Sequence, residues 1–249
     1  MTTIALINQK GGVGKTTSTI NLGAGLAMLG KSVLLVDLDP QAHLTYGLGI
    51  AAHDLVYTVY EVLRGEVTAQ EAILKRGQLE VLPSSLGLSA AEMELSGMAG
   101  REFLLKEALA TLPPRDFVLL DCPPSLGLLT LNALTAAQEV FIPLQTEFLA
   151  LQGMSKLIDT INVVKKRLNP NLTISGIIGT QFDGRKNLNR EVVEKIREYF
   201  ADKFFETIIH DNVALAEAPS YGQTIFEYRP DCRGAQDYLA LSREAVARR

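Results

Sequence analysis

The chain alternates short, nearly continuous apolar runs with longer stretches in which polar and apolar residues are mixed. Apolar runs of this kind are typical of parallel strands covered on both faces, and the mixed stretches favour helices. This alternation predicts an α/β fold with a doubly wound, mostly parallel sheet and helices on both of its faces. Strands are predicted at residues 3–7, 31–37, 79–83, 116–121, 139–144, 173–180 and 204–209.

Helices are predicted between these strands. The first begins at Ser18 and ends before Gly30, which suits the left-handed residue that often follows a helix. Thr68 suits the N-cap of a short helix, because Glu71 stands three positions later. A mobile loop rich in Thr, Tyr and Gly is predicted at residues 42–49. The predicted helices are residues 18–29, 56–63, 68–75, 88–112 with interruptions near Gly97 and Gly100, 151–168, 189–200 and 234–247.

Composition limits the class of protein. Hydrophobic residues make up 47% and charged residues 21%, which predicts a folded chain, and with no evident linker a single domain over residues 1–249 is expected. The net charge of −4 means that nucleic-acid binding would require a local basic patch. Cys122 and Cys232 form no metal-ligand pattern, and no apolar run reaches the ~20 residues that span a bilayer. The first strand begins at the N-terminus and leaves no room for a signal peptide, so a soluble, cytoplasmic protein is expected.

The segment from Asn8 to Thr17 joins the first predicted strand to the first predicted helix and reads N-Q-K-G-G-V-G-K-T-T. Strand, glycine-rich loop and helix form the context of a phosphate-binding loop, in which backbone N–H groups converge on phosphate oxygens. Lys15 is expected to reach the β- and γ-phosphates of a nucleotide, and the Thr16 hydroxyl to hold Mg²⁺. A simple glycine-rich turn is a disfavoured alternative, because strand, loop and helix all agree.

This loop departs from the standard pattern G-x-x-x-x-G-K-[ST]. Gln9 occupies the first glycine position, and a second lysine, Lys10, follows it. The resulting octapeptide, K-G-G-V-G-K-T-T, resembles the deviant P-loop of the ParA/MinD family of ATPases. The expected nucleotide-binding residues of the loop are Lys10, Gly11, Gly12, Val13, Gly14, Lys15, Thr16 and Thr17.

Carboxylates follow two of the predicted strands. Asp37 and Asp39 stand at the end of the second strand, where open α/β sheets bind ligands, and alternation along the strand should point them the same way. Asp121 ends the strand at residues 116–121 and forms a Walker-B-like arrangement that helps to hold Mg²⁺. The segment C-P-P-S-L-G that begins at Cys122 suits the sensing of a γ-phosphate. Cys122 itself is expected to be a small buried residue and not a nucleophile.

Further motifs extend the resemblance over essentially the whole chain. In order, these are residues 10–17, 36–41 (V-D-L-D-P-Q), 120–125 (L-D-C-P-P-S) and 217–222 (E-A-P-S-Y-G). In combination they are similar to the chromosomal ParA/Soj-type partition ATPases. From this resemblance, the short N-terminus is expected to lack the helix-turn-helix domain of the longer plasmid-type relatives.

The resemblance implies a homodimer that sandwiches ATP and Mg²⁺. In that family the extra lysine, here Lys10, reaches the phosphates bound by the other subunit, so hydrolysis would depend on dimerisation. By the same resemblance Asp39 positions or activates the attacking water, with Asp37 beside it, and Asp121 supports Mg²⁺. The region of Asn212 resembles the family segment that lies over the adenine. Lys10, Lys15 and Asp39 are thus the expected catalytic residues, with Thr16, Asp37 and Asp121 at the metal.

The resemblance also implies non-specific binding of double-stranded DNA in the ATP state, association with the nucleoid, and a ParB/Spo0J-like partner. The expected DNA-binding residues are Arg185, Lys186 and Arg190, with Lys156, Lys165, Lys166 and Arg167 as possible support. Glu191, Glu194 and Glu198 dilute this basic region. The chain also carries Asp211 and Ala214 in a segment where chromosomal relatives usually have basic residues, and ordinary solvated charges are the alternative interpretation.

Other functions share this loop. A MinD-like membrane-cycling ATPase needs a C-terminal amphipathic anchor, but residues 237–249 carry few bulky apolar side chains and suit a core helix, so no stable membrane insertion is expected. A ParA-like positioner of non-chromosomal cargo could have identical ATPase residues. An iron–sulphur reductase is disfavoured because Cys122 stands beside Asp121. A small-molecule kinase is possible, although no separate acceptor-binding constellation is evident.

Overall fold

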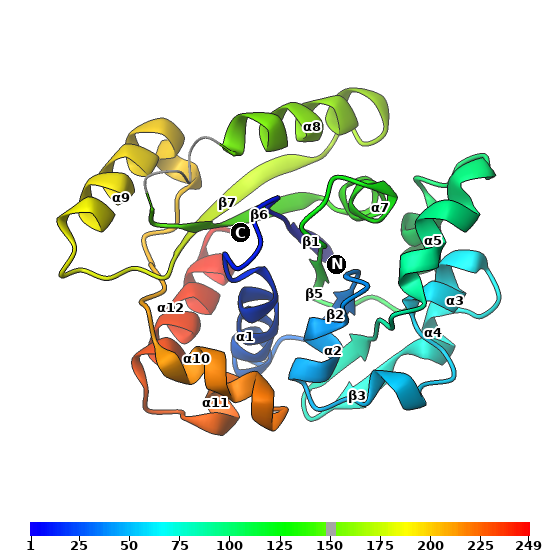
Figure 1. Ribbon diagram of the computed structural model, residues 1–249, viewed down its shortest axis with the longest axis horizontal. Helices are drawn as coiled ribbons and strands as arrows, with labels where there is room; N and C mark the ends of the chain where they lie inside the picture. Colours follow the sequence, from blue (N-terminus) through cyan, green and yellow to red (C-terminus); the bar gives the residue numbers. More distant parts are fainter. Residues whose placement is uncertain (148–152) are drawn as a thin grey trace.

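The computed structural model describes residues 1–147 and 153–249 of the chain. Its centre is a seven-stranded sheet in the order β3-β4-β2-β5-β1-β6-β7 (Figure 1). Every neighbouring pair is parallel except β3 and β4, which are antiparallel. The predicted fold class is therefore confirmed. The strands are β1 (Thr2–Leu6), β2 (Val33–Asp37), β3 (Leu74–Arg76), β4 (Leu79–Leu82), β5 (Phe117–Asp121), β6 (Glu139–Gln145) and β7 (Thr173–Thr180).

Helices cover both faces of the sheet, because side chains of the central strands alternate between two apolar clusters. In β1, Ile4 and Leu6 enter one cluster and Ala5 the other, and all three are fully buried. One cluster joins the sheet to α3–α9, and the other joins the opposite face to α1, α2 and α10–α12 (Figure 1). The helices are α1 (Lys15–Met28), α2 (His43–Gly47), α3 (Val59–Arg64), α4 (Ala69–Ala72), α5 (Leu88–Glu94), α6 (Leu104–Ala110), α7 (Leu128–Ala136), α8 (Met154–Arg167), α9 (Asn187–Phe200), α10 (Val213–Glu217), α11 (Ile225–Tyr228) and α12 (Arg233–Ala247).

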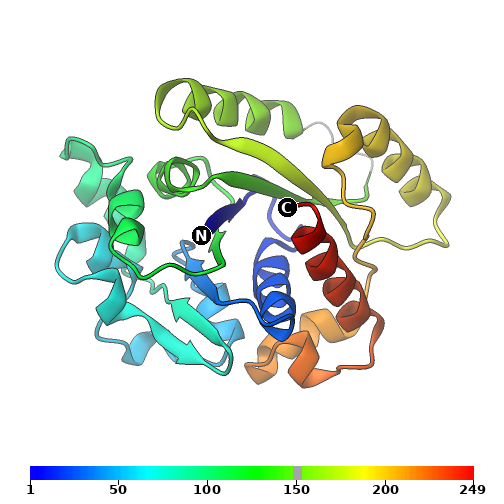
Figure 2. The same ribbon diagram turned by 180° about the vertical axis from the view of Figure 1, so that it is seen from behind.

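The C-terminal helix α12 packs along α1, as both views show (Figure 2). Tyr238 and Leu241 of α12 are buried, and a methyl group at Gly25 of α1 would collide with Ser242. At the end of the chain, the Arg248 guanidinium donates to the backbone carbonyls of Asp202 and Phe204. The predicted core-packing helix at residues 234–247 is therefore confirmed.

Two predicted elements differ from the structure. Residues 42–49 are not all loop, because α2 forms at His43–Gly47 and is anchored by the fully buried side chains of Leu44 and Leu48. Residues 204–209 run beside β7 but do not form a regular strand. Phe205 N donates to Ile177 O, and Ile209 N donates to Gly179 O. The two donors are four residues apart, whereas the two acceptors on β7 are only two residues apart, so a regular ladder of hydrogen bonds does not form.

Element boundaries also shift. Thr68 and Glu71 form the predicted capping box, but α4 ends at Ala72 because the next residues pair with β4 as strand β3. The long helical region at residues 88–112 is broken, as predicted, into α5 and α6. The predicted start of a helix at residue 151 lies outside the described residues, within which α8 begins at Met154.

Candidate functional site

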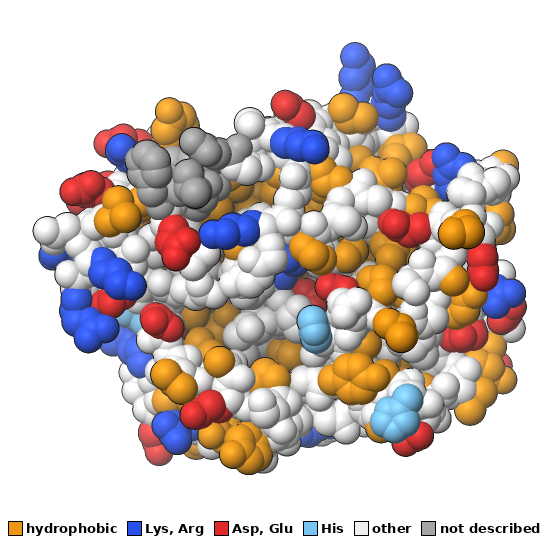
Figure 3. All heavy atoms as spheres, viewed as in Figure 1, with side chains coloured by type: hydrophobic (Ala, Val, Ile, Leu, Met, Phe, Trp, Pro, Cys, Tyr) orange, Lys and Arg blue, Asp and Glu red, His pale blue; other side chains and the backbone are white. Residues whose placement is uncertain are grey.

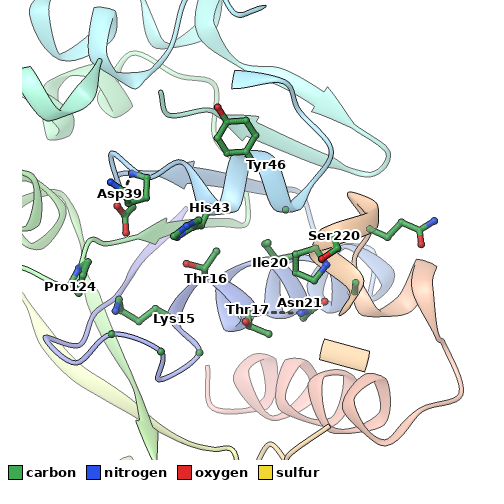
Figure 4. Close-up of a pocket in the computed structure, with 18 of the residues that line it drawn as sticks. Lys15, Thr16, Thr17, Ile20, Asn21, Asp39, His43, Tyr46, Pro124 and Ser220 are labelled. Carbon is green, nitrogen blue, oxygen red and sulfur yellow. Dashed lines mark hydrogen bonds between the residues drawn. The ribbon is translucent and has the colours of Figure 1, made fainter. Parts of the chain in front are cut away.

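A cleft of about 610 Å³ lies at the carboxyl end of the central strands. Its walls are the loop between β1 and α1, the turn after β2, helix α2 and a short 3-10 helix, η5 (Ala218–Tyr221) (Figure 4). Asp39 faces Lys15 and Thr16 across the cleft, while Tyr46 and Ser220 lie farther along it. The structure thus gathers the residues of the glycine-rich loop and Asp39 around one cavity.

The glycine-rich loop has a fixed conformation. Gly12 and Gly14 adopt left-handed φ angles of 73° and 85°, which only glycine accommodates without strain. The end of β7 holds two carbonyls of the loop: Gln181 Nε2 donates to Gly12 O at 2.7 Å, and Thr180 Oγ1 donates to Val13 O at 2.9 Å. Because a trans peptide points its N–H opposite to its C=O, the next two N–H groups face away from β7. They are therefore free to bind an anion.

Lys15 lies at the start of α1 and is 7% exposed. Its ammonium group donates to the backbone carbonyl of Lys10 at 3.3 Å. Burial lowers the pKa of Lys15, and the nearby carboxylates of Asp121 and Asp39 act in the opposite direction. Because Lys15 is buried without an ion pair to either carboxylate, a negatively charged ligand in the cleft would stabilise its ammonium group.

Asp121, at the end of β5, is fully buried. Its Oδ1 accepts from Thr19 Oγ1 at 3.3 Å, but its Oδ2 has no hydrogen-bond partner within the described residues. Burial raises the pKa of Asp121 above the ordinary carboxyl value, and the charge of Asp37 raises it further. Thr16 lines the cleft and its hydroxyl lies close enough to lower that pKa, so Thr16 and the unpartnered carboxylate oxygen of Asp121 together fit a divalent cation. Mg²⁺ keeps several waters, so it does not need a dense set of protein ligands.

Asp37 and Asp39 have different surroundings. Asp39 is 8% exposed and lines the cleft, where its Oδ1 accepts from Gln41 N at 2.9 Å. Asp37 is fully buried, and both of its oxygens accept hydrogen bonds from residues of the following turn and helix. The geometry therefore brings Asp39 to the cleft and holds Asp37 behind the turn, next to Asp121 on the neighbouring strand, and the place of Asp37 at the metal stays a prediction.

Lys10 points away from its own cleft. Its ammonium group donates to Gln145 Oε1 at 2.8 Å and lies 3.3 Å from Glu147 Oε2, at the end of β6. Lys10 and Glu147 are 47% and 53% exposed, so the pair lies at the surface. Within one chain, Lys10 therefore contributes its backbone carbonyl to Lys15 but not its charge to the cleft.

Asn212 lines a smaller hollow of about 140 Å³ that shares Gly14, Thr17 and Gln181 with the main cleft. Its side-chain oxygen caps α10 by accepting from Ala214 N at 3.0 Å. The hollow lies next to the loop, where a nucleotide base could extend from bound phosphates. The role of Asn212 at the adenine remains a prediction.

Several residues of the cleft were not predicted from the sequence. His43 and Tyr46 line it from α2, and the assignment of residues 42–49 to a loop gave no reason to select them. Gln181 borders both cavities but stands in no motif. The motif at residues 217–222 was recognised, and η5 within it supplies Ala218, Pro219 and Ser220 to the wall.

The predicted DNA-binding residues lie together at the connection between β7 and α9. Arg185 is 92% exposed and forms a two-pronged ion pair with Asp183, at 2.9 and 3.0 Å. Lys186 lies 3.9 Å from the same carboxylate, and Arg190 contacts Asn187. Lys and Arg side chains gather over this edge of the molecule (Figure 3). The basic last turn of α8, residues 165–167, lies at the end of α8 that is farther from α9, so it does not extend the patch (Figure 1).

Known proteins resemble this chain in sequence and in structure. Residues 1–174 match the family model described as an AAA domain. The chain is 48% identical over 247 residues to the sporulation initiation inhibitor protein Soj of Bacillus subtilis, covering 98% of both chains. It is 49% identical over 249 residues to the chromosome-partitioning ATPase Soj of Treponema pallidum, covering 99% of this chain and 97% of that one.

Among solved structures, the chain resembles cobyrinic acid a,c-diamide synthase from Mycobacterium smegmatis with bound ADP and magnesium. The TM-score is 0.87 at 38% identity, covering 99% of this chain and 94% of that one. The structural likeness spans the described sheet and both helical layers.

Proposed function

Because this chain belongs to the ParA/Soj family of chromosome-partitioning ATPases, we propose that it segregates chromosomal or plasmid DNA by a cycle of ATP-dependent dimerisation. The chain is an ATPase, and its dimer would bind duplex DNA without sequence preference and respond to a ParB/Spo0J-like partner. The observation that carries this proposal is the cleft itself. It combines a phosphate loop, a buried lysine and Asp39, whereas Lys10 is directed outside it.

The residues of the cleft divide the work of hydrolysis. The loop N–H groups and Lys15 bind and orient the triphosphate, and Thr16 with Asp121 would hold Mg²⁺, which supplies positive charge beside the phosphates. Asp39 accepts a hydrogen bond from the attacking water and fixes its direction. Asp39 need not be a strong base, since phosphoryl transfer depends mainly on positioning and electrostatic stabilisation.

Lys10 completes the site in a second subunit. Its ammonium group leaves Gln145 and Glu147 and contacts the triphosphate of the partner, where it stabilises charge in the transition state. A cation supplied in trans in this way, as by an arginine finger, is worth about 10³–10⁵ in rate. Turnover then requires the dimer, and the isolated subunit binds ATP without hydrolysing it.

The DNA surface is the group of Arg185, Lys186 and Arg190. A dimer presents two copies of this patch, and affinity for DNA falls with salt by a logarithmic slope of about 0.9 for each phosphate contacted. The ion pairs of Asp183 with Arg185 and Lys186 reduce the free positive charge of each copy. DNA binding by one subunit is therefore weak, and the doubling makes it strong.

Three observations favour DNA over a membrane or a small-molecule substrate. The apolar side chains of α12, including Tyr238 and Leu241, are occupied by packing on α1, which leaves little apolar surface for a membrane anchor. The described part of the chain includes no helix that is both long and apolar enough to cross a membrane. The relative named a chromosome-partitioning ATPase is also more similar in sequence than the solved structure named as a synthase, at 49% against 38% identity. Protein cargo in the same cytoplasmic cycle remains the second candidate.

An electrophoretic mobility shift with non-specific duplex DNA tests the proposal. We expect retention with ATP and Mg²⁺, little retention with ADP or without nucleotide, and a steep loss as salt rises. ATP-dependent dimerisation without any shift would favour protein cargo instead. Flotation with anionic liposomes in the presence of ATP provides the comparison for a membrane-cycling ATPase.

A further inference from the structure

Four buried residues form a closed ring of hydrogen bonds behind the cleft. The Asp37 carboxylate accepts from Thr45 Oγ1 at 2.7 Å and from Thr45 N at 2.9 Å. Thr45 Oγ1 in turn accepts from Ser84 N at 3.0 Å, and Ser84 Oγ donates to Asp39 O at 2.8 Å. Asp39 N closes the ring by donating to the other Asp37 oxygen at 3.1 Å.

The ring joins elements that are distant in sequence. Asp37 ends β2, Thr45 lies in α2, and Ser84 follows β4. Asp37, Thr45 and Ser84 are all 0% exposed, so water does not compete for these hydrogen bonds. Both polar backbone atoms of Asp39 are therefore fixed by side chains of the ring.

The turn between Asp39 and α2 is held in a strained form. Ala42 adopts a left-handed φ of 53°, and its N–H donates to Asp39 O at 2.8 Å. A non-glycine residue keeps such a conformation only where its surroundings enforce it. The Asp39 carbonyl thus accepts from both Ala42 N and Ser84 Oγ, and the ring supplies the restraint from outside the turn.

We infer that Thr45 and Ser84 are positioning residues that hold the Asp39 carboxylate at the point of water attack, and that Asp37 anchors them. The inference rests on the proposed role of Asp39 in hydrolysis. Asp39 Oδ1 is bound to Gln41 N within the turn, so the direction of the free oxygen follows the backbone that the ring fixes. A shift of about 1 Å in such a group can lower a rate about 10²-fold.

This assignment separates turnover from nucleotide binding. Within the described residues, no hydrogen bond joins the ring to the glycine-rich loop, and two carbonyls of the loop are held by Thr180 and Gln181. Disturbing the ring should therefore change kcat and leave the affinity for nucleotide nearly unchanged. A residue needed only for folding would alter both, together with the melting temperature.

The test compares Thr45→Val, which keeps the shape but removes the hydroxyl, with Thr45→Ser, which keeps the hydroxyl. Steady-state ATPase assays and titration with a fluorescent ATP analogue measure kcat and Kd on the full chain. We expect Thr45→Val to lower kcat at least about tenfold with Kd within about threefold, and Thr45→Ser to retain most of the wild-type kcat. In an Asp39→Asn background, Thr45→Val should lower kcat no further.

Ser84→Ala provides an independent variant, and Ser89→Ala at the surface is its matched control. If Thr45→Val does not fold, a lowered kcat of Ser84→Ala with unchanged Kd supports the inference, and a wild-type kcat overturns it. Wild-type kcat in Thr45→Val, or an equal loss of kcat and affinity, also overturns it while leaving the proposed function intact. A wild-type chain that does not hydrolyse ATP even as a dimer would overturn both.

Discussion

The ammonium group of Lys10 lies 3.3 Å from a carboxylate oxygen of Glu147 in the same chain. Gln145 strengthens the contact by accepting from Lys10 at 2.8 Å and donating to Glu147 at 2.8 Å. The pair is about half exposed, and ion pairs of this kind are worth at most about 1 kcal/mol. The contact is therefore weak enough to break, and the proposed action of Lys10 in trans requires it to leave Glu147 and Gln145 for the partner's triphosphate.

Replacing Glu147 by Gln should favour the ATP-bound dimer. The variant removes one attraction in each of the two subunits, at most about 2 kcal/mol in total, so the dimer should form at a protein concentration up to about 30-fold lower. Sedimentation velocity over a concentration series with ATP and Mg²⁺ measures the shift. Glu206→Gln, which removes a surface ion pair with Arg197, is the control. A weaker dimer in Glu147→Gln would mean that Glu147 contributes to the interface itself.

Lys10→Ala should separate binding from turnover. The side chain lies outside its own cleft, so one subunit should bind ATP with nearly wild-type affinity. Dimerisation and hydrolysis should both be lost, because no cation is supplied to the partner's triphosphate. Light scattering and phosphate release measure the two steps. Normal hydrolysis by the variant would contradict the role in trans.

The fold could be predicted because each buried strand is marked by the apolar residues of its own short segment. Buried parallel strands require apolar runs, and the runs at residues 116–121 and 173–180 gave β5 and β7 nearly unchanged. The segment at residues 204–209, which reads F-F-E-T-I-I, is also largely apolar but does not form a regular strand. Its hydrogen bonds to β7 are irregularly spaced. The residues of the segment alone do not indicate how it pairs with β7.

The phosphate loop could be predicted for a similar reason, since its glycines and lysines follow one another in a single segment of the sequence. The difference between Asp37 and Asp39 could not. The two residues stand two positions apart at the end of one strand, but Thr45 donates to one carboxylate oxygen of Asp37, whereas Ser84 donates to the backbone carbonyl of Asp39. Those partners come from α2 and from the end of β4, so only the folded chain brings them together.

Asp39→Ala should trap the dimer. Lys10, Lys15 and the loop remain to bind ATP between two subunits, but the attacking water loses the carboxylate that directs it. We expect hydrolysis to fall to a small fraction of the wild-type rate, while the ATP-bound dimer persists on gel filtration. Wild-type turnover in this variant would remove Asp39 from the mechanism.

Gln181→Ala should weaken nucleotide binding. The amide of Gln181 holds Gly12 O at 2.7 Å, and its loss frees one peptide of the phosphate loop. A hydrogen bond of this kind contributes about 0.5–1.5 kcal/mol, which corresponds to a roughly 2- to 12-fold rise in Kd for ATP. Isothermal titration calorimetry measures the change, with Gln78→Ala in the β3–β4 turn as the control. An unchanged Kd would show that the loop keeps its shape without this contact.

Asp183 and Arg185 should have opposite effects on DNA binding. The hydrogen bonds from Arg185 lower the pKa of Asp183 to about 2, so the carboxylate is charged at every pH at which the protein would be assayed. Asp183→Asn frees Arg185 for a phosphate and should raise DNA affinity in the ATP state, whereas Arg185→Glu should lower it and reduce the salt slope. Fluorescence anisotropy at several salt concentrations measures both effects, and Asp231→Asn on the surface controls for net charge.

ATP hydrolysis should be unchanged in all three variants, because the patch does not line the cleft. Equal DNA affinity for Asp183→Asn and Arg185→Glu would move the DNA surface away from the connection between β7 and α9.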